Sequence, residues 1–418
     1  MRFPIPARRA RRTDRASTDR APASRRLIPA VALVSAAALA VAGCSSPQEA
    51  ANGPTGDDAP YKVGLIYSQS GALASYGAQY IEGFRAGLDY ATNGTRKVGN
   101  HPIEVTEVDD AGDPEKAVAA ARDLIGEGYK IIAGSTASGV ALQVAPIAEQ
   151  NKVLFISGPA ATDGITGANR YTFRSGRQSY QDVLTASSFM GDPAGKKVLV
   201  FAQDSAFGQA NAAAVTAVIG GQGAEVESLL VPADVQEFTT FAAQALAANA
   251  DLIFVAWAGT TAPAMWQALD QQGVLAATTV VTGLDIRATW PTFGAAGTNI
   301  DFLAHYFDGA SDTPASRALA DAIGGPIDLF HPDGFTAAQM IVRALEEGGD
   351  DVEAMIAALE GWTFESVKGS YEVRAADHAL LQPMFQTRLT GSGDNLEAEL
   401  VKALPASDVA PPPTPFED

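Results

Sequence analysis

Small polar residues follow several predicted strands at the point where each strand ends, and they are suited to binding a small charged ligand. The stretch Gly134–Gly139 follows the apolar run Lys130–Ala133 and leads into a helical pattern over Val140–Glu149. A helix that begins on small residues exposes its first backbone N–H groups and the positive end of its dipole, which favours a carboxylate. Ser138 adds a hydroxyl. Serine is also an ordinary helix N-cap, so the local pattern leaves both roles open.

Three further strand ends carry residues that could bind a ligand. They are Thr162 after the run Lys152–Ile156, Trp257 after Asp251–Ala256, and Asp285 after Thr279–Thr282. Simpler roles exist for each: a turn residue for Thr162, a core residue for Trp257, and a helix cap or solvated acid for Asp285. Ligands of open parallel sheets bind beyond the carboxyl ends of the strands, so these residues are candidates for one site.

The elements that must position these residues alternate along the chain between strand and helix patterns. Further strands are predicted at Lys62–Tyr67, Ile103–Val108 and Lys197–Ala202, and a helix at Gly77–Tyr90. Asp113-Pro114 is typical of a helix start, with Asp as N-cap and Pro at the first helical position. Alternation predicts the α/β class with helices on both faces of parallel sheets, and the number of strands favours two Rossmann-like lobes over one sheet.

The composition bounds the size and the partners of the protein. The chain has 418 residues, 47% of them hydrophobic, which is enough for two domains with full cores. Its formal net charge is −19. Such a surface repels polyphosphates, so binding to nucleic acid is disfavoured.

The two ends of the chain differ from the part between them. Residues 1–43 have an arginine-rich start, a short apolar run and small residues before Cys44, which predicts a lipoprotein signal peptide cut before a lipidated Cys44. The apolar run Leu27–Ala42 is shorter than the roughly 20 residues of a membrane-spanning helix. Residues 44–60 are rich in proline, glycine and small polar residues, which predicts a flexible tether. The similar composition of residues 404–418 predicts a disordered, proline-rich tail. We therefore expect an exported protein, lipid-anchored on the outer face of the cytoplasmic membrane.

Several chemistries are disfavoured by the residues available. Cys44 is the only cysteine, and none of the four histidines has another at metal-ligand spacing. The sequence contains no Gly-x-Ser-x-Gly motif, and Gly191–Lys197 lacks the spacing of a phosphate-binding loop. We expect no enzyme activity, no metal and no cofactor.

Short motifs follow one another in a fixed order over residues 61–395. They are Val63–Gly77, Glu82–Phe84, Asp109–Pro114, Ser138–Ala141, Ala145–Glu149, Pro159–Thr162, Tyr171–Arg174 and Gly334–Ala338. This collinear set resembles the type I periplasmic-type solute-binding proteins of ABC importers, in particular the leucine/isoleucine/valine-binding branch. No single motif is decisive, but their order is specific.

The resemblance implies two lobes that are joined by three hinge crossings and close on the ligand. The crossings are expected near Phe173–Gly176, His305–Gly309 and Lys368–Tyr371. The first lobe would then comprise residues 61–174 and 308–368, and the second lobe residues 175–307 and 369–403.

The resemblance also implies a set of ligand-binding residues. The set is Tyr76, Ser138, Gly139, Ala160, Ala161, Thr162, Phe207, Trp257, Gly259 and Asp285. Ser138 and Thr162, with the backbone at Ala160, would hold an amino-acid carboxylate from the first lobe. Asp285 would receive the ammonium from the second lobe, and the three aromatic residues would flank the ligand's side chain.

Departures from the family pattern leave the identity of the ligand open. Phe207 stands where many members have tyrosine, so the pocket loses a hydroxyl. Asp285 is shorter than the glutamate of the branched-chain binders. Thr260 or Thr261 could line the pocket in place of Trp257.

The resemblance predicts a monomeric binding lipoprotein that captures an amino acid or similar zwitterion and presents it to an ABC permease. Two alternatives remain: a ligand-sensing lipoprotein, and a binder of a short amide or an aromatic carboxylate.

Overall fold

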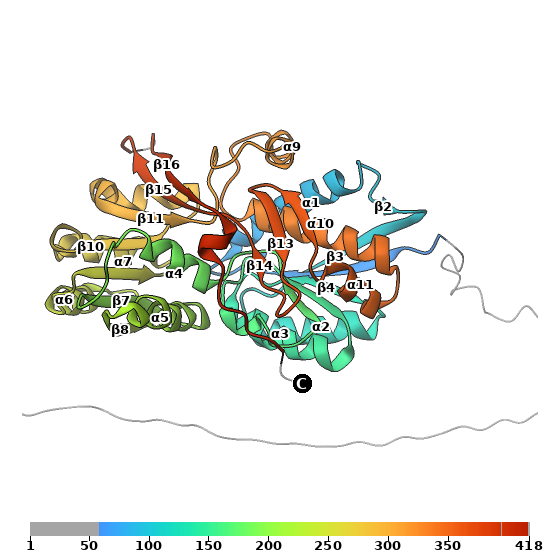
Figure 1. Ribbon diagram of the computed structural model, residues 1–418, viewed down its shortest axis with the longest axis horizontal. Helices are drawn as coiled ribbons and strands as arrows, with labels where there is room; N and C mark the ends of the chain where they lie inside the picture. Colours follow the sequence, from blue (N-terminus) through green and yellow to red (C-terminus); the bar gives the residue numbers. More distant parts are fainter. Residues whose placement is uncertain (1–57, 394, 417–418) are drawn as a thin grey trace, which may run out of the picture. The chain divides into compact units, whose positions relative to one another are not determined.

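The computed structural model of the protein describes residues 58–393 and 395–416. Two lobes, each built around its own sheet, lie side by side in this part of the chain (Figure 1). The predicted signal peptide (1–43), the lipidation at Cys44 and most of the tether (44–60) lie outside the described residues. The predicted α/β class with two parallel-sheet lobes is confirmed.

The first lobe contains a six-stranded sheet in the order β2-β3-β1-β4-β5-β6, in which only β2 is antiparallel to its neighbour. Its strands are β1 (Tyr61–Tyr67), β2 (Lys97–Val98), β3 (His101–Asp109), β4 (Ile131–Gly134), β5 (Leu154–Ser157) and β6 (Thr172–Arg174). Its helices are α1 (Ala74–Ala91), α2 (Pro114–Gly126), α3 (Ser138–Asn151), α10 (His331–Gly348) and α11 (Val352–Leu359), with the short 3-10 turn η1 (Asp163–Ile165).

Alternate residues of the central strand β1 face two different helix layers. Val63 and Leu65 pack in one cluster with α1 and α10, whereas Ile66 packs in another with α2 and α3. This alternation follows from the two-residue period of a strand. The helix α2 begins as predicted, because the Asp113 side chain accepts hydrogen bonds from two N–H groups of the first turn and Pro114 follows it.

Two glycines let α1 and α10 approach each other at backbone distance. A Cβ atom at Gly83 would collide with the carbonyl oxygen of His331, and a Cβ atom at Gly334 would collide with that of Tyr80. The close crossing fixes the start of α10 against the middle of α1. The cavity described below lies at these two helix starts.

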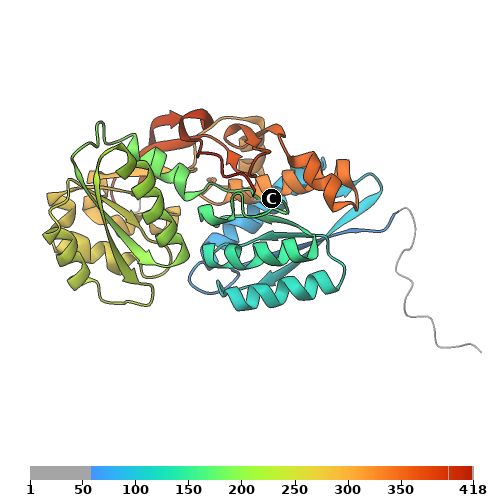
Figure 2. The ribbon, with the colours of Figure 1, turned by 60° about the horizontal axis from the view of Figure 1, so that its bottom comes forward.

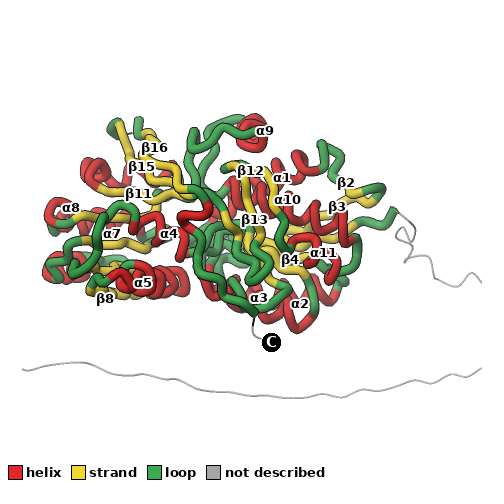
Figure 3. The backbone as a smooth tube through the Cα atoms, viewed as in Figure 1, coloured by secondary structure: helices red, strands yellow, loops and turns green. Residues whose placement is uncertain are grey.

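The second lobe contains a seven-stranded sheet in the order β16-β15-β11-β10-β9-β7-β8. Its strands are β7 (Lys197–Asp204), β8 (Glu225–Pro232), β9 (Leu252–Ala256), β10 (Thr279–Gly283), β11 (Ile300–Ala304), β15 (Met384–Thr390) and β16 (Glu397–Leu404), and the last two are antiparallel. Its helices are α4 (Ser179–Ser187), α5 (Ala206–Val218), α6 (Thr239–Ala247), α7 (Ala262–Gln271) and α8 (Val274–Ala277), with the 3-10 segments η2 (Gly220–Gln222) and η3 (Arg287–Asn299). In Figure 3 the strands of each lobe lie between helices.

The chain passes between the two sheets at three places. It leaves the first lobe between β6 and α4, and it leaves the second lobe after β11, where α9 (Pro314–Ile323) leads to α10. The third passage lies between β14 (Leu380–Leu381) and β15, later in the chain than the predicted Lys368–Tyr371. The reason is that β13 (Gly369–Val373) and β14, which pair in a small sheet with β12 (Thr363–Ser366), bury Tyr371, Val373 and Leu380 in the core of the first lobe. The predicted second-lobe range 369–403 therefore begins too early, because residues 369–381 belong to the first lobe.

The C-terminal segment is ordered by contacts with both lobes, contrary to the predicted disordered tail at 404–418. After β16, the turn η4 (Ala406–Val409) buries Val409 beside Met384. Further on, the Pro411 carbonyl accepts a hydrogen bond of 2.7 Å from Arg374, and the Thr414 N–H donates to Asp377 at 2.9 Å. Prolines lack an N–H but keep a carbonyl acceptor, so a proline-rich segment can dock in an extended form. Figure 2 shows this segment lying over the junction of the lobes.

A buried arginine at the end of β6 holds the first passage in place. The Arg174 side chain is 1% exposed, and its guanidinium donates to the carbonyl oxygens of Arg177 at 2.8 Å and Thr162 at 2.6 Å. Burial lowers the pKa of Arg174 to about 10, while the carboxylate of Asp163 favours the charged form. The group therefore stays protonated at neutral pH.

Replacing Arg174 by methionine should lower the free energy of unfolding by about 3 kcal/mol or more, because two buried carbonyls and the half-buried Asp163 would lose their cationic partner. Urea denaturation measures the change. Arg170→Met is the matched control, since Arg170 pairs with Glu353 with both side chains about half exposed and should cost less than about 1 kcal/mol. Equal losses in the two variants would contradict the structural role given to Arg174.

Candidate ligand-binding site

A cavity of about 340 Å³ lies between the lobes, where the carboxyl ends of the parallel strands meet. Loops after β1, β3, β4 and β5 form its first-lobe wall, and loops after β7, β9, β10 and β11 form its second-lobe wall. This size and this place are typical of a small-molecule site.

The start of α3 opens on the cavity from the first lobe. The N-cap residue Ala137 has no side chain that can cap the helix, and Ser138 and Gly139 line the cavity beside it. The Ser138 Oγ accepts a hydrogen bond of 3.2 Å from the Thr162 N–H, so its own hydrogen remains available to a ligand. N–H groups, a hydroxyl and the helix dipole together form an anion-binding end.

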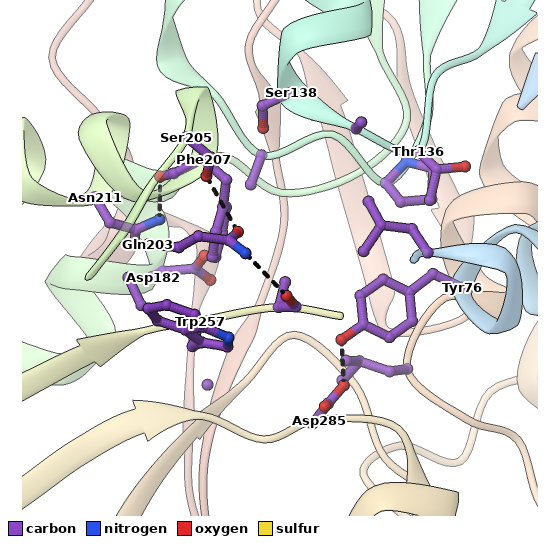
Figure 4. A pocket seen from close by; sticks show the side chains of 18 of the residues that line it. Tyr76, Thr136, Ser138, Asp182, Gln203, Ser205, Phe207, Asn211, Trp257 and Asp285 are labelled. Atoms are coloured by element: carbon purple, nitrogen blue, oxygen red, sulfur yellow. Dashed lines mark hydrogen bonds between the residues drawn. The ribbon is translucent and has the colours of Figure 1, made fainter. Parts of the chain in front are cut away.

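Asp285 lines the cavity from the second lobe and is bound directly to the first. The Tyr76 hydroxyl, on α1, donates to the Asp285 Oδ1 at 2.7 Å, and the Ile286 N–H donates to the same oxygen at 2.8 Å (Figure 4). Burial raises the pKa of the Asp285 carboxyl, and the hydrogen bond from Tyr76 opposes that shift. Burial and the neighbouring Asp285 raise the pKa of Tyr76, so the tyrosine stays a donor.

Aromatic side chains form much of the remaining wall. The rings of Tyr76 and Phe330 lie 4.5 Å apart, and Phe207 lines the cavity from the start of α5. Trp257 also lines it, with its Nε1 donating to the Thr261 Oγ1 at 3.0 Å and its ring 5.1 Å from that of Phe238. These walls suit an apolar or aromatic part of a ligand.

Seven of the ten predicted residues line the cavity. They are Tyr76, Ser138, Gly139, Ala161, Phe207, Trp257 and Asp285. Ala160, Thr162 and Gly259 are not among the residues that line it. The Ala160 N–H already donates to the Ser135 carbonyl, and the Thr162 hydroxyl accepts from the Gly164 N–H, so Thr162 acts on the site through its bond to Ser138.

Eight polar residues of the lining were missed by the sequence analysis. They are Thr136, Arg177, Asp182, Gln203, Ser205, Asn211, Thr282 and His305. Arg177 and Asp182 come just after the first passage, and their Nε and Oδ2 atoms lie 3.2 Å apart. A charged pair five residues apart next to a helix start carries little signal in the sequence, because an exposed pair looks the same.

Neither a metal site nor a membrane helix is found in the described residues. No three of their His, Cys, Asp and Glu side chains gather as metal ligands would. No helix within 58–393 and 395–416 combines the length and the apolarity needed to cross a bilayer.

Two α/β lobes that enclose a small-molecule cavity between the ends of their strands define a two-lobed solute-binding protein. Residues 60–394 match the model of the periplasmic binding protein family, and the chain belongs to this family.

Relatives and solved structures agree with this assignment. The chain is 26% identical over 310 residues to the Leu/Ile/Val-binding protein BraC3 of Rhizobium johnstonii, covering 71% of this chain and 83% of that protein. It is 26% identical over 302 residues to the Leu/Ile/Val-binding protein of Escherichia coli, covering 70% and 81%. A branched-chain amino acid ABC-type transporter structure from Rhodopseudomonas palustris gives a TM-score of 0.71 at 30% identity, covering 85% of this chain and all of that one. A solute-binding protein from R. palustris in complex with 4-hydroxybenzoate gives 0.76 at 24% identity, covering 83% and 97%.

The predicted family and role are thus confirmed. The protein is a periplasmic binding protein of ABC transporters, homologous to Leu/Ile/Val-binding proteins. The family implies an exported protein that binds a small molecule and works with an ABC permease.

Replacing Tyr76 by phenylalanine should favour the open form of the ligand-free protein. The variant keeps the ring contact with Phe330 but loses the hydrogen bond to Asp285, and a hydrogen bond to a charged group contributes about 1.5 kcal/mol or more, roughly tenfold in the ratio of closed to open molecules. The distance between one spin label on each lobe measures the shift. Tyr90→Phe, on the exposed side of the same helix, is the control and should change nothing.

Proposed function

We propose that the protein captures an α-amino acid between its lobes and delivers it to an ABC permease without catalysing a reaction. The observation that carries the proposal is the pair of opposite polar ends on the two walls of one cavity. The start of α3 with Ser138 supplies N–H and hydroxyl donors, and Asp285 supplies a carboxylate acceptor. A carboxylate and an ammonium need these partners, because an ion taken out of water without one costs several kcal/mol.

The position of the two ends on different lobes links binding to closure. A ligand held by Ser138 alone contacts the first lobe, whereas one that also reaches Asp285 contacts both. Contacts made only in the closed form shift the open–closed equilibrium toward it. A closed, loaded protein is then the form that a permease recognises.

An aromatic carboxylate is the second candidate ligand. It is favoured by the tilted rings of Tyr76 and Phe330 and by the two protein donors that already occupy the Asp285 Oδ1. Solved structures of the same fold hold 4-hydroxybenzoate and benzoate. A ligand-sensing role would use the same cavity, and neighbouring permease and ATPase genes would separate transport from sensing.

The amino-acid proposal predicts that removing the ammonium weakens binding. L-Leucine and L-glutamine should each bind about tenfold or more tightly than their deaminated analogues, 4-methylpentanoate and 4-carbamoylbutanoate, because only the amino acids bond to Asp285. Isothermal titration calorimetry measures the four affinities. Asp285→Asn should remove the difference within each pair, whereas Ser138→Ala should weaken both members of a pair alike. Deaminated analogues that bind as tightly as the amino acids would refute the role given to Asp285.

The proposal also predicts that the affinity for the amino acids falls with acidification. Burial raises the pKa of Asp285, so its ionised form, which accepts the ammonium, is lost as the pH falls through that raised value. Isothermal titration calorimetry at a series of pH values measures the change.

We further propose that the chain is a lipoprotein anchored through Cys44. The support is the run Val41-Ala42-Gly43-Cys44 after a short apolar stretch and an arginine-rich start. The anchor and the tether 44–60 would keep a monomeric binding protein near its permease.

Anchoring predicts that Cys44→Ser releases the protein from the membrane. The native chain, expressed in a bacterium that processes lipoproteins, should incorporate labelled palmitate and sediment with membranes, and the variant should do neither. Ser45→Ala is the control, since it alters the neighbouring residue and spares the sulfur. Label in the Cys44→Ser variant would contradict the anchor.

A further inference from the structure

Three residues of the cavity wall carry buried polar atoms that have no hydrogen-bond partner among the described residues. They are the Asp182 Oδ1, the Arg177 Nε and the His305 Nε2. The three residues are 3%, 8% and 3% exposed, and all three line the cavity. Buried polar groups are nearly always hydrogen-bonded in folded proteins, so unpartnered ones in a cavity wall point to a ligand.

The geometry of Arg177 and Asp182 places a donor and an acceptor next to each other. The guanidinium is held from behind, where Nη1 donates to the Pro159 carbonyl at 2.8 Å. Its Nε lies 3.2 Å from the Asp182 Oδ2 in an ion pair that is too poorly aligned for a hydrogen bond. The second carboxylate oxygen, Oδ1, is left unused.

The charges around these residues are of both signs in equal number. Arg177 stands beside Asp182, and Lys368 with Asp333 and Arg174 with Asp163 add two further groups of each sign nearby. Burial, with the neighbouring cation of Arg177, lowers the pKa of His305 well below its usual value, so this ring is neutral. A charged ligand group would meet a like charge here, whereas a neutral group with both a donor and an acceptor would not.

We propose that Arg177 and Asp182 form a subsite for a carboxamide at the end of the ligand's side chain, so that the protein prefers a glutamine-like amino acid. The amide oxygen accepts from Arg177, and the amide N–H donates to the Asp182 Oδ1. This inference rests on the proposed amino-acid function. Figure 4 shows Asp182 on the side of the cavity with Gln203, Asn211 and Trp257, and Tyr76 with Asp285 on the opposite side.

The wild-type protein tests the subsite with three side chains of similar length. Isothermal titration calorimetry should show L-glutamine binding at least about tenfold more tightly than L-methionine, which leaves the polar atoms unpartnered, and than L-glutamate, which brings a second carboxylate to Asp182. L-Methionine or L-glutamate binding as tightly as L-glutamine would overturn the proposal.

Asp182→Asn provides a test that a loss of stability cannot imitate. Without the Asp182 charge, the cation of Arg177 is unopposed in the cavity, so the preference for L-glutamine over L-glutamate should fall by about tenfold or more. Asp251→Asn is the control, because Asp251 is a second-lobe carboxylate that accepts from the Lys197 N–H at the start of β7 and does not line the cavity. An unchanged preference in Asp182→Asn would overturn the subsite. If that variant does not fold, the wild-type series decides.

The two proposals fail in different ways. If L-methionine binds better than L-glutamine, and both bind better than their deaminated analogues, the carboxamide subsite is wrong and the amino-acid function stands. If 4-carbamoylbutanoate binds as tightly as L-glutamine, the amino-acid function is wrong, and the carboxamide subsite fails with it as a glutamine site.

Discussion

The guanidinium of Arg174 is the contact on which the geometry of the cavity depends. It binds the carbonyl of Thr162, in the loop after β5, and the carbonyl of Arg177, in the passage to the second lobe. The Thr162 N–H in turn bonds to the Ser138 hydroxyl at the start of α3. One buried cation thus contacts the chain next to both the proposed carboxylate-binding end at Ser138 and the proposed subsite at Arg177.

The closed arrangement of the lobes rests on a second set of contacts at the mouth of the cavity. Tyr76 bonds to Asp285 and packs with Ile286 and Phe330 in a small apolar cluster that spans both lobes. The close crossing of α1 and α10, which Gly83 allows, brings Tyr76 and Phe330 together. The cavity therefore has an aromatic rim built by helix packing, while the polar residues of its wall come mostly from loops.

The sequence predicted the elements well where strand and helix patterns alternate, because hydrophobic period and capping residues are local signals. It also placed Ser138 and Asp285 at one site, since both follow strands of parallel sheets. It missed the parallel strands β8 and β11, and also β15 and β16, whose antiparallel pairing has no local signature. It took the proline-rich end for disordered although Arg374 binds it. Arg177 and Asp182 were missed because only the tertiary fold buries an ion pair.

The C-terminal segment has a consequence for how the two lobes can move. It begins on the second-lobe sheet at β16 and ends on the first lobe, where the Phe416 ring lies 4.7 Å from that of His378. Together with the three passages, four stretches of chain then join the lobes along one side of the molecule. Twisting or sliding would stretch at least one of these connections, so rotation about a single axis along that side is the motion left to the lobes. Because β1 at the start of the described chain also belongs to the first lobe, a tether attached there would make the second lobe the moving arm.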